Sequence, residues 1–158
     1  MKIKKLMLYN FGVYAGENTF LFEGSKPIVL IGGMNGRGKT TFLEAVLLAL
    51  YGSNSNAYLE SGQKSYAKYL KAFINRNAKN NSCGVELEFE IDYGVNETYV
   101  VERKWYSNNR NVTEDIKVYK DGEYNKFLTD NWAMFVENIL PSALSSFFFF
   151  DGEKIAEL

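Results

Sequence analysis

The chain has 158 residues, 46% of them hydrophobic, which is enough for one folded domain with a core. Its 18 Lys and Arg nearly balance 19 Asp and Glu, which excludes the overall positive charge of a dedicated nucleic-acid binder and restricts any DNA contact to a local patch. No histidine and a single cysteine, Cys83, exclude imidazole chemistry, an internal disulfide and a thiolate metal cluster. Because the first residues lack the apolar run of a signal peptide, we expect a cytoplasmic protein that does not enter a membrane.

The first third of the chain predicts a hairpin, a buried strand, a loop and a helix, in that order. Residues 2–10 alternate between apolar and polar side chains and are followed by a glycine-containing loop and a second strand at 19–22. The apolar run 28–31 is typical of a fully buried strand. From Thr40 the apolar residues recur at helical spacing, which predicts a helix that ends at Tyr51 and Gly52.

The remaining chain predicts an insertion, a meander and a return to the core. Residues 53–84 are polar, with a helix at about 65–75, and are interpreted as an insertion. Residues 85–93, 98–106 and 116–119 predict antiparallel strands with one solvated face. An amphipathic helix is expected at 126–140, followed by a buried strand at 147–150.

The loop between the buried strand and the first helix matches the phosphate-binding pattern G-x-x-x-x-G-K-[ST]. Its glycines let backbone N–H groups point at phosphate oxygens, and the helix that follows adds a partial positive charge. Lys39 is expected to reach the β- and γ-phosphates, Thr40 to bind Mg²⁺ and Thr41 to support the α- or β-phosphate. For Met34 and Arg37 the prediction covers the backbone alone. The sequence therefore predicts an Mg-ATP site, whose residues are Gly33, Met34, Asn35, Gly36, Arg37, Gly38, Lys39, Thr40 and Thr41.

The loop also has the form G-x-N-G-x-G-K-T, and the chain begins with Leu6-x-Leu8-x-Asn10-Phe11 before a tight glycine loop. Together these resemble the N-terminal half of the ABC-type ATPase heads of SMC, RecF and double-strand-break-repair proteins. The resemblance covers the whole chain and implies an α/β P-loop NTPase lobe with a mixed sheet, an antiparallel meander and a helical insertion. It also implies that Asn10, Phe11 and Tyr14 line the base or ribose; an ordinary role in the hairpin is the open alternative.

A narrower resemblance rests on residues 146–155, which contain four consecutive phenylalanines and Asp151, and on residues 45–52. These segments are similar to the DndD family, the ATPases of bacterial DNA phosphorothioate (sulfur) modification, and imply other DNA sulfur modification proteins as partners. Related heads usually place Gln before Gly-Glu, where this chain has Asp151. A carboxylate can take the same place near Mg²⁺, so Asp151 is a candidate catalytic and metal residue beside Lys39; capping the following turn is the alternative.

The resemblance also implies parts that these residues do not contain. An ABC head needs a Walker B carboxylate pair and a signature motif, which the family places after a coiled coil in a C-terminal lobe. We therefore expect a half-head that hydrolyses ATP only with that lobe and a second head. Three alternatives stay open: a lobe of another SMC-like DNA repair or phage-defence ATPase, a non-hydrolysing nucleotide sensor, and a small complete P-loop NTPase with Asp151 as Walker B and Glu153 as base.

Two weaker signals lie in the insertion. Lys64, Lys68 and Lys71 are expected to share one helical face that could contact DNA, and a solvated basic face is the alternative. Residues 59–63 resemble the ABC signature at three positions, but directly after the first helix they are interpreted as a polar turn.

Overall fold

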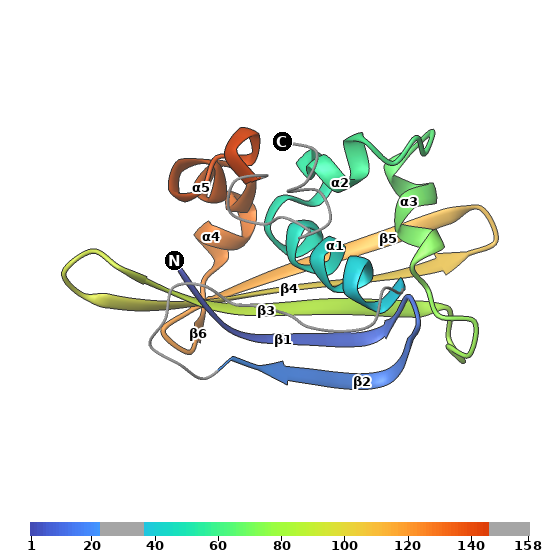
Figure 1. The fold of residues 1–158 in the computed structure, drawn as a ribbon, viewed down its shortest axis with the longest axis horizontal. Coiled ribbons are helices and arrows are strands. Elements are labelled where there is room, and N and C mark those ends of the chain that lie inside the picture. The colour runs from blue at the N-terminus through green and yellow to red at the C-terminus, as the bar shows by residue number, and fades with distance from the viewer. Residues whose placement is uncertain (23–36, 146–158) are drawn as a thin grey trace.

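The described part of the chain is built on one antiparallel sheet in the order β2-β1-β3-β4-β5-β6 (Figure 1). The structure is a computed structural model that describes residues 1–22 and 37–145, with residues 37–40 described by their backbone only. The strands are β1 Lys2–Phe11, β2 Tyr14–Leu21, β3 Ser82–Asp92, β4 Asn96–Asn108, β5 Asn111–Lys120 and β6 Glu123–Tyr124. The helices are α1 Arg37–Tyr51, α2 Asn56–Leu59, α3 Tyr66–Ala72, α4 Lys126–Asp130 and α5 Trp132–Ile139, with short 3₁₀ turns at Gly52–Asn54 and Ser142–Leu144.

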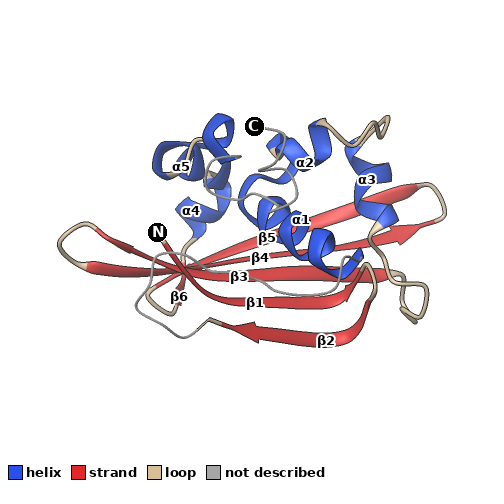
Figure 2. Cartoon of the chain, in the orientation of Figure 1, coloured by secondary structure: helices blue, strands red, loops and turns tan. Residues whose placement is uncertain are grey.

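The helices gather on one face of the sheet (Figure 2). Along β1 the side chains of Leu6 and Leu8 point to that face and are fully buried, whereas Met7 and Tyr9 lie on the other face and are half-buried. Helix α1 packs against β3 and β4, and its residues from Ala45 to Tyr51 are all buried. The antiparallel pairing of β3 with β4 and of β4 with β5, with one face of the sheet covered, confirms the predicted meander.

The first hairpin is tighter than predicted. β2 begins at Tyr14, well before the strand expected at 19–22, so that Gly12 and Val13 alone form the turn. Two residues with positive φ make this possible, Asn10 at 46° and Gly12 at 59°. The Gly16 N–H donates to Asn10 Oδ1 at 2.7 Å, and this bond closes the turn locally.

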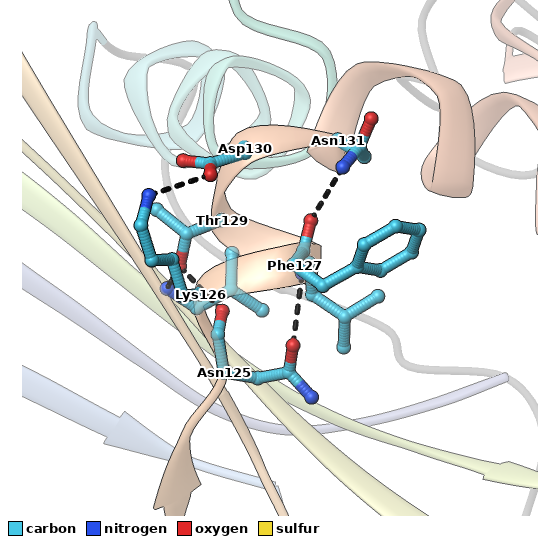
Figure 3. A network of polar contacts seen from close by, with 8 residues as sticks. Asn125, Lys126, Phe127, Thr129, Asp130 and Asn131 are labelled. Carbon is cyan, nitrogen blue, oxygen red and sulfur yellow. Dashed lines mark hydrogen bonds and ion pairs between the residues drawn. The ribbon is translucent and has the colours of Figure 1, made fainter.

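The predicted helix at 126–140 is two helices, α4 and α5, separated at Asn131 (φ −121°, ψ 23°). Side chains compete with the helical backbone here (Figure 3): Asn125 Oδ1 accepts from the Leu128 N–H at 2.9 Å, and Asn131 Nδ2 donates to the Phe127 carbonyl at 2.8 Å. Thr129 Oγ1 also accepts from the Val118 N–H of β5 at 3.0 Å, which fixes α4 on the sheet. One long helix was therefore the wrong prediction: Asn125 starts α4, and α4 ends at Asp130, where the side chain of Asn131 takes the Phe127 carbonyl.

Helix α1 ends where expected, since Gly52 follows it at φ 55°. The insertion contains α2 and α3, and α3 is shorter than the predicted 65–75. Residues 60–65 form a turn and bends, with Leu59 65% exposed and Gly62 at φ 76°, which agrees with the interpretation of this segment as a polar turn.

Several predictions fall outside the described residues. These are the strands at 28–31 and 147–150, Asp151 and Glu153, and the loop residues Gly33, Met34, Asn35 and Gly36. All pairings between the described strands are antiparallel, and the predicted mixed character of the sheet depended on the two strands outside this part. Within residues 1–22 and 37–145, no helix is long and apolar enough to cross a membrane.

Candidate nucleotide-binding site

Helix α1 begins at Arg37, inside the phosphate-loop motif, so Gly38, Lys39 and Thr40 lie in its first turn. The first N–H groups of a helix have no acceptor within it, and the helix dipole gives this end a partial positive charge. Both properties suit a phosphate group. The buried run of α1 holds the helix rigidly on the sheet, so its N-terminus has a fixed position relative to β1 and β2.

The β1–β2 turn packs directly on this end of α1. A Cβ added to Gly12 would lie 2.8 Å from Cγ2 of Thr41, and the positive φ of Gly12 disfavours any other residue. Thr41 is itself buried, with 8% of its surface exposed. The hairpin turn and the first turn of α1 therefore form one packed unit, with Gly12 against the residue that follows the Gly-Lys-Thr sequence.

The three residues predicted to line the base or ribose have different surroundings. Phe11 is completely buried, stacks on Phe73 with ring centroids 4.5 Å apart and meets Trp105 edge-on at 6.0 Å. Asn10 is 8% exposed and uses its side-chain oxygen for Gly16. Tyr14 is half-buried and lies edge-on to Phe20 at 5.7 Å. The burial of Phe11 favours the alternative role in the hairpin, while Asn10 and Tyr14 remain candidates at the nucleotide.

Arg103 was not singled out from the sequence, yet it organises the opposite end of α1. It is 7% exposed; its Nε donates to the Ala49 carbonyl at 3.1 Å and its Nη1 to Glu114 Oε1 at 3.3 Å. Tyr66 donates to the other oxygen of Glu114 at 2.5 Å, and burial, followed by the charge of Glu114, raises the pKa of Tyr66 far above its ordinary value. A cation at a helix C-terminus is stabilised by the dipole. The alternation of β4 could have revealed this, because Arg103 falls between Val101 and Trp105 on the face of the strand that points into the core.

The basic residues of the insertion lie at the surface. Lys64, Lys68 and Lys71 are all exposed, and Tyr69 and Leu70 of the same segment are buried. Only Lys68 and Lys71 belong to α3; Lys64 precedes its N-cap, Ser65, and so does not share the helical face that was predicted for all three. The break comes from Ser65, whose side chain accepts from the Lys68 N–H and starts the helix there.

Metal-binding residues were predicted at Thr40 and Asp151, and the side chains of both lie outside the described part of the chain. Among the residues that the structure does describe, no group of three or more Asp, Glu, Cys or His could hold a metal ion. The donor chemistry still fits Mg²⁺, because a hydroxyl, a carboxylate and phosphate oxygens are the hard ligands that it prefers. The Mg²⁺ site remains a prediction.

A helix with Gly-Lys-Thr in its first turn, held on an antiparallel sheet, fits the N-terminal lobe of an ABC-type P-loop ATPase head. The chain belongs to the AAA domain family, whose match extends over residues 5–157.

The chain is similar in sequence to three curated relatives. The chain is 44% identical over 52 residues to the C subunit of Nuclease SbcCD from Treponema pallidum (strain Nichols), across 33% of this chain and 5% of that protein. It is 39% identical over 59 residues to the same component of Nuclease SbcCD from Vibrio cholerae serotype O1, across 36% and 6%. It is 33% identical over 113 residues to Uncharacterized protein 094L of Invertebrate iridescent virus 3, across 69% and 13%. The chain thus spans a small part of each relative, and the family match together with the two SbcCD similarities supports an SMC-like ATPase lobe.

Proposed function

We propose that the chain is the Mg-ATP-binding lobe of a DndD-like ATPase of DNA phosphorothioate (sulfur) modification. Hydrolysis would require a C-terminal lobe and a second head. The observation that supports nucleotide binding best is the position of Gly38, Lys39 and Thr40 in the first turn of α1, next to a hairpin turn that packs on Thr41. The narrower assignment rests on the phenylalanine-rich segment 147–150 and on Asp151.

Each residue of the site has a role that follows from its chemistry. The backbone N–H groups from Gly33 to Gly38 would surround the phosphates, and Lys39 would neutralise charge on the β- and γ-phosphates. Thr40 and Asp151 would hold Mg²⁺, which supplies further positive charge as the γ-phosphoryl group leaves. The base that orients the attacking water would come from the C-terminal lobe.

Calorimetry of Mg-ATP binding, with turnover measured in parallel, tests the proposal. Wild-type chain should bind Mg-ATP, Lys39→Ala should abolish binding, and Lys117→Ala, an exposed lysine of β5, should bind as wild type does. ATP turnover should be negligible for the chain alone and should rise when a C-terminal lobe with Walker B and signature motifs is added. Unchanged binding by Lys39→Ala would contradict the phosphate-loop assignment.

The alternatives give different results in the same assays. Rapid turnover by the isolated chain would indicate a small complete NTPase in which Asp151 and Glu153 form a Walker B pair. Tight binding without turnover, even with the added lobe, would indicate a nucleotide sensor. Either result would keep the assignment of an ATP-binding site and would contradict the proposal that the chain is one half of an ATPase head.

A second candidate is a lobe of a DNA repair ATPase, which the identity of 44% and 39% to the C subunit of Nuclease SbcCD favours. Deletion of the gene in its host separates the two candidates. Loss of phosphorothioate linkages from genomic DNA supports sulfur modification. Normal phosphorothioate levels together with sensitivity to double-strand breaks would favour repair.

The assembly is also proposed to contact DNA, and Lys64, Lys68 and Lys71 are the candidate residues on this lobe. All three are exposed, and Lys68 and Lys71 lie together on α3. Substitution of all three by Gln should weaken DNA binding by the assembled protein and flatten its dependence on salt concentration, by about one counterion for each phosphate that is no longer neutralised. Equal salt dependence in wild type and variant would assign the lysines to a solvated face.

A further inference from the structure

The end of the insertion is hydrogen-bonded to the β1–β2 turn, although the two segments are far apart in the sequence. The Gly12 N–H donates to the Phe73 carbonyl at 2.6 Å, and the Asn75 N–H donates to the Asn10 carbonyl at 2.9 Å. Phe11 and Ile74 form an isolated antiparallel bridge between these bonds. Residues 10–12 therefore pair with residues 73–75 through backbone hydrogen bonds, as neighbouring strands do, in addition to their pairing within the β1–β2 hairpin.

The side chain of Asn75 completes this contact. Its Nδ2 donates to the Gly12 carbonyl at 2.7 Å, and its Oδ1 accepts from the Asn77 N–H at 2.9 Å. A side-chain amide donates at its nitrogen and accepts at its oxygen, so Asn75 makes both bonds at once. An Asp at this position would keep the acceptor and lose the donor, and an Ala would lose both.

Gly12 also packs closely on helix α1. A Cβ on Gly12 would come within 2.8 Å of Thr41 Cγ2, so the turn lies against the helix on one contact and is hydrogen-bonded to Asn75 through another. In the proposed site, Lys39 serves the β- and γ-phosphates and Thr41 the α- or β-phosphate. A turn that rests on Thr41 therefore lies on the nucleoside side of the γ-phosphate, where Asn10 and Tyr14 are proposed to meet the base and ribose.

We infer that Asn75 is a positioning residue for the nucleoside: it holds the β1–β2 turn, with Asn10 and Tyr14, against the base and ribose end of ATP. This inference rests on the proposed nucleotide-binding function. Asn75 itself need not touch the nucleotide. Its effect should therefore appear in the binding of the nucleoside and not in the binding of the phosphates.

Binding of Mg-ATP and of Mg-tripolyphosphate, which lacks base and ribose, is measured by calorimetry on the full chain. Asn75→Ala should weaken Mg-ATP binding about tenfold, which corresponds to one net hydrogen bond, and change tripolyphosphate binding less than twofold. Asn75→Asp keeps the size of the side chain and the bond from Asn77, and should give the same selective loss. Asn77→Ala, on an exposed neighbour, should behave as wild type.

A loss of equal size for both ligands, or unchanged Mg-ATP binding in both Asn75 variants with a normal circular dichroism spectrum, would overturn the inference alone. The proposed function would survive those results. If wild-type chain bound neither ligand, the proposed function would fail and the inference with it. Asn75→Asp guards against misfolding of the alanine variant, because the aspartate is isosteric with the native side chain.

Discussion

Tyr69 carries a buried hydroxyl that has no hydrogen-bond partner among the described residues. The residue is 3% exposed, and its ring packs on Tyr58 and Phe73. Burial, and next the charge of Glu44, raises the pKa of Tyr69 well above its ordinary value, so the hydroxyl stays protonated. An unsatisfied buried hydroxyl costs roughly 1–3 kcal/mol. We expect Tyr69→Phe to raise the free energy of unfolding by about 1 kcal/mol, measured by urea denaturation.

Tyr66→Phe is the matched control, because it removes a hydroxyl that is bonded to the Glu114 carboxylate. This variant should lower the free energy of unfolding by roughly 1.5–3 kcal/mol, the range for a hydrogen bond to a charged group. A loss of stability in Tyr69→Phe as large as in Tyr66→Phe would show that the Tyr69 hydroxyl has a partner in solution.

Glu86 lies on the open face of the sheet, directly opposite Glu102 on β4. Burial raises the pKa of the Glu86 carboxyl; Lys5 lowers it, and Glu102 and Glu88 raise it. A carboxyl whose pKa is higher in the folded state binds protons more tightly there, so its contribution is favourable below the unfolded pKa and is lost as pH rises through the folded pKa. Glu86→Gln should therefore stabilise the protein at pH 7 by up to about 1 kcal/mol.

The gain from Glu86→Gln should shrink as pH falls toward 4, where the wild-type carboxyl becomes neutral too. Thermal unfolding across this range gives the measurement. Glu123→Gln, on the exposed strand β6, is the control and should show little change at either pH. A gain that is the same at pH 4 and pH 7 would mean that packing of the amide, and not charge, causes the effect.

At the scale of elements, the contact between the hairpin turn and α1 can be tested by adding a methyl group to Gly12 and removing one from Thr41. Gly12→Ala places a Cβ against Thr41 Cγ2 and strains a residue at φ 59°. We expect a loss of at least about 2 kcal/mol in unfolding free energy, from the backbone and the overlap together. Thr41→Ser deletes Cγ2 and keeps the hydroxyl, so the double variant should recover the steric part of the loss.

A double-mutant cycle on unfolding free energies isolates that steric part as a coupling between Gly12→Ala and Thr41→Ser. Gly16→Ala is a useful control, because Gly16 has a similar φ of 68° but nothing within 4 Å of an added Cβ. It should show the backbone cost without coupling to Thr41→Ser. If the changes in unfolding free energy of Gly12→Ala and Thr41→Ser were additive, the turn would not contact the helix at Thr41.

The elements that the sequence predicted well are those with a strong local signal. The alternation of Val85, Leu87 and Phe89 is visible without any partner, and so is the helical spacing of α1. The early start of β2 and the break at Asn131 depend on side-chain bonds of Asn10 and Asn131 to the backbone, which composition does not reveal.

Within the site, a sequence motif predicts the phosphate-loop residues, whereas no motif marks the contacts that support them. The bond between Asn75 and Gly12 joins residues 63 positions apart, and Arg103 depends on a carbonyl 54 positions away. Phe11 looked equally suited to a base or to the core, and its stack on Phe73 favours the core. Such choices are made by tertiary packing, so a single sequence leaves them open.

For the whole molecule, the sheet and α1 would provide the phosphate-binding half of the proposed ATPase site. Among the described residues, no group of three or more Asp, Glu, Cys or His could hold a metal ion there. The curated relatives are much longer, since the chain spans 5%, 6% and 13% of their lengths. In the proposed function, the remaining groups come from a C-terminal lobe and from a second head. The rate of hydrolysis per head should then depend on the fraction of heads that have formed dimers.

We expect the turnover number of the completed head to rise with protein concentration and to reach a plateau once the heads are dimeric. Adding Lys39→Ala heads to a fixed amount of wild-type heads should lower the rate, because mixed dimers carry one site without the phosphate-binding lysine. Lys117→Ala heads, added in the same amounts, should raise it. A turnover number that is constant from nanomolar to micromolar protein, and indifferent to Lys39→Ala heads, would mean that one completed head contains every group needed to hydrolyse ATP.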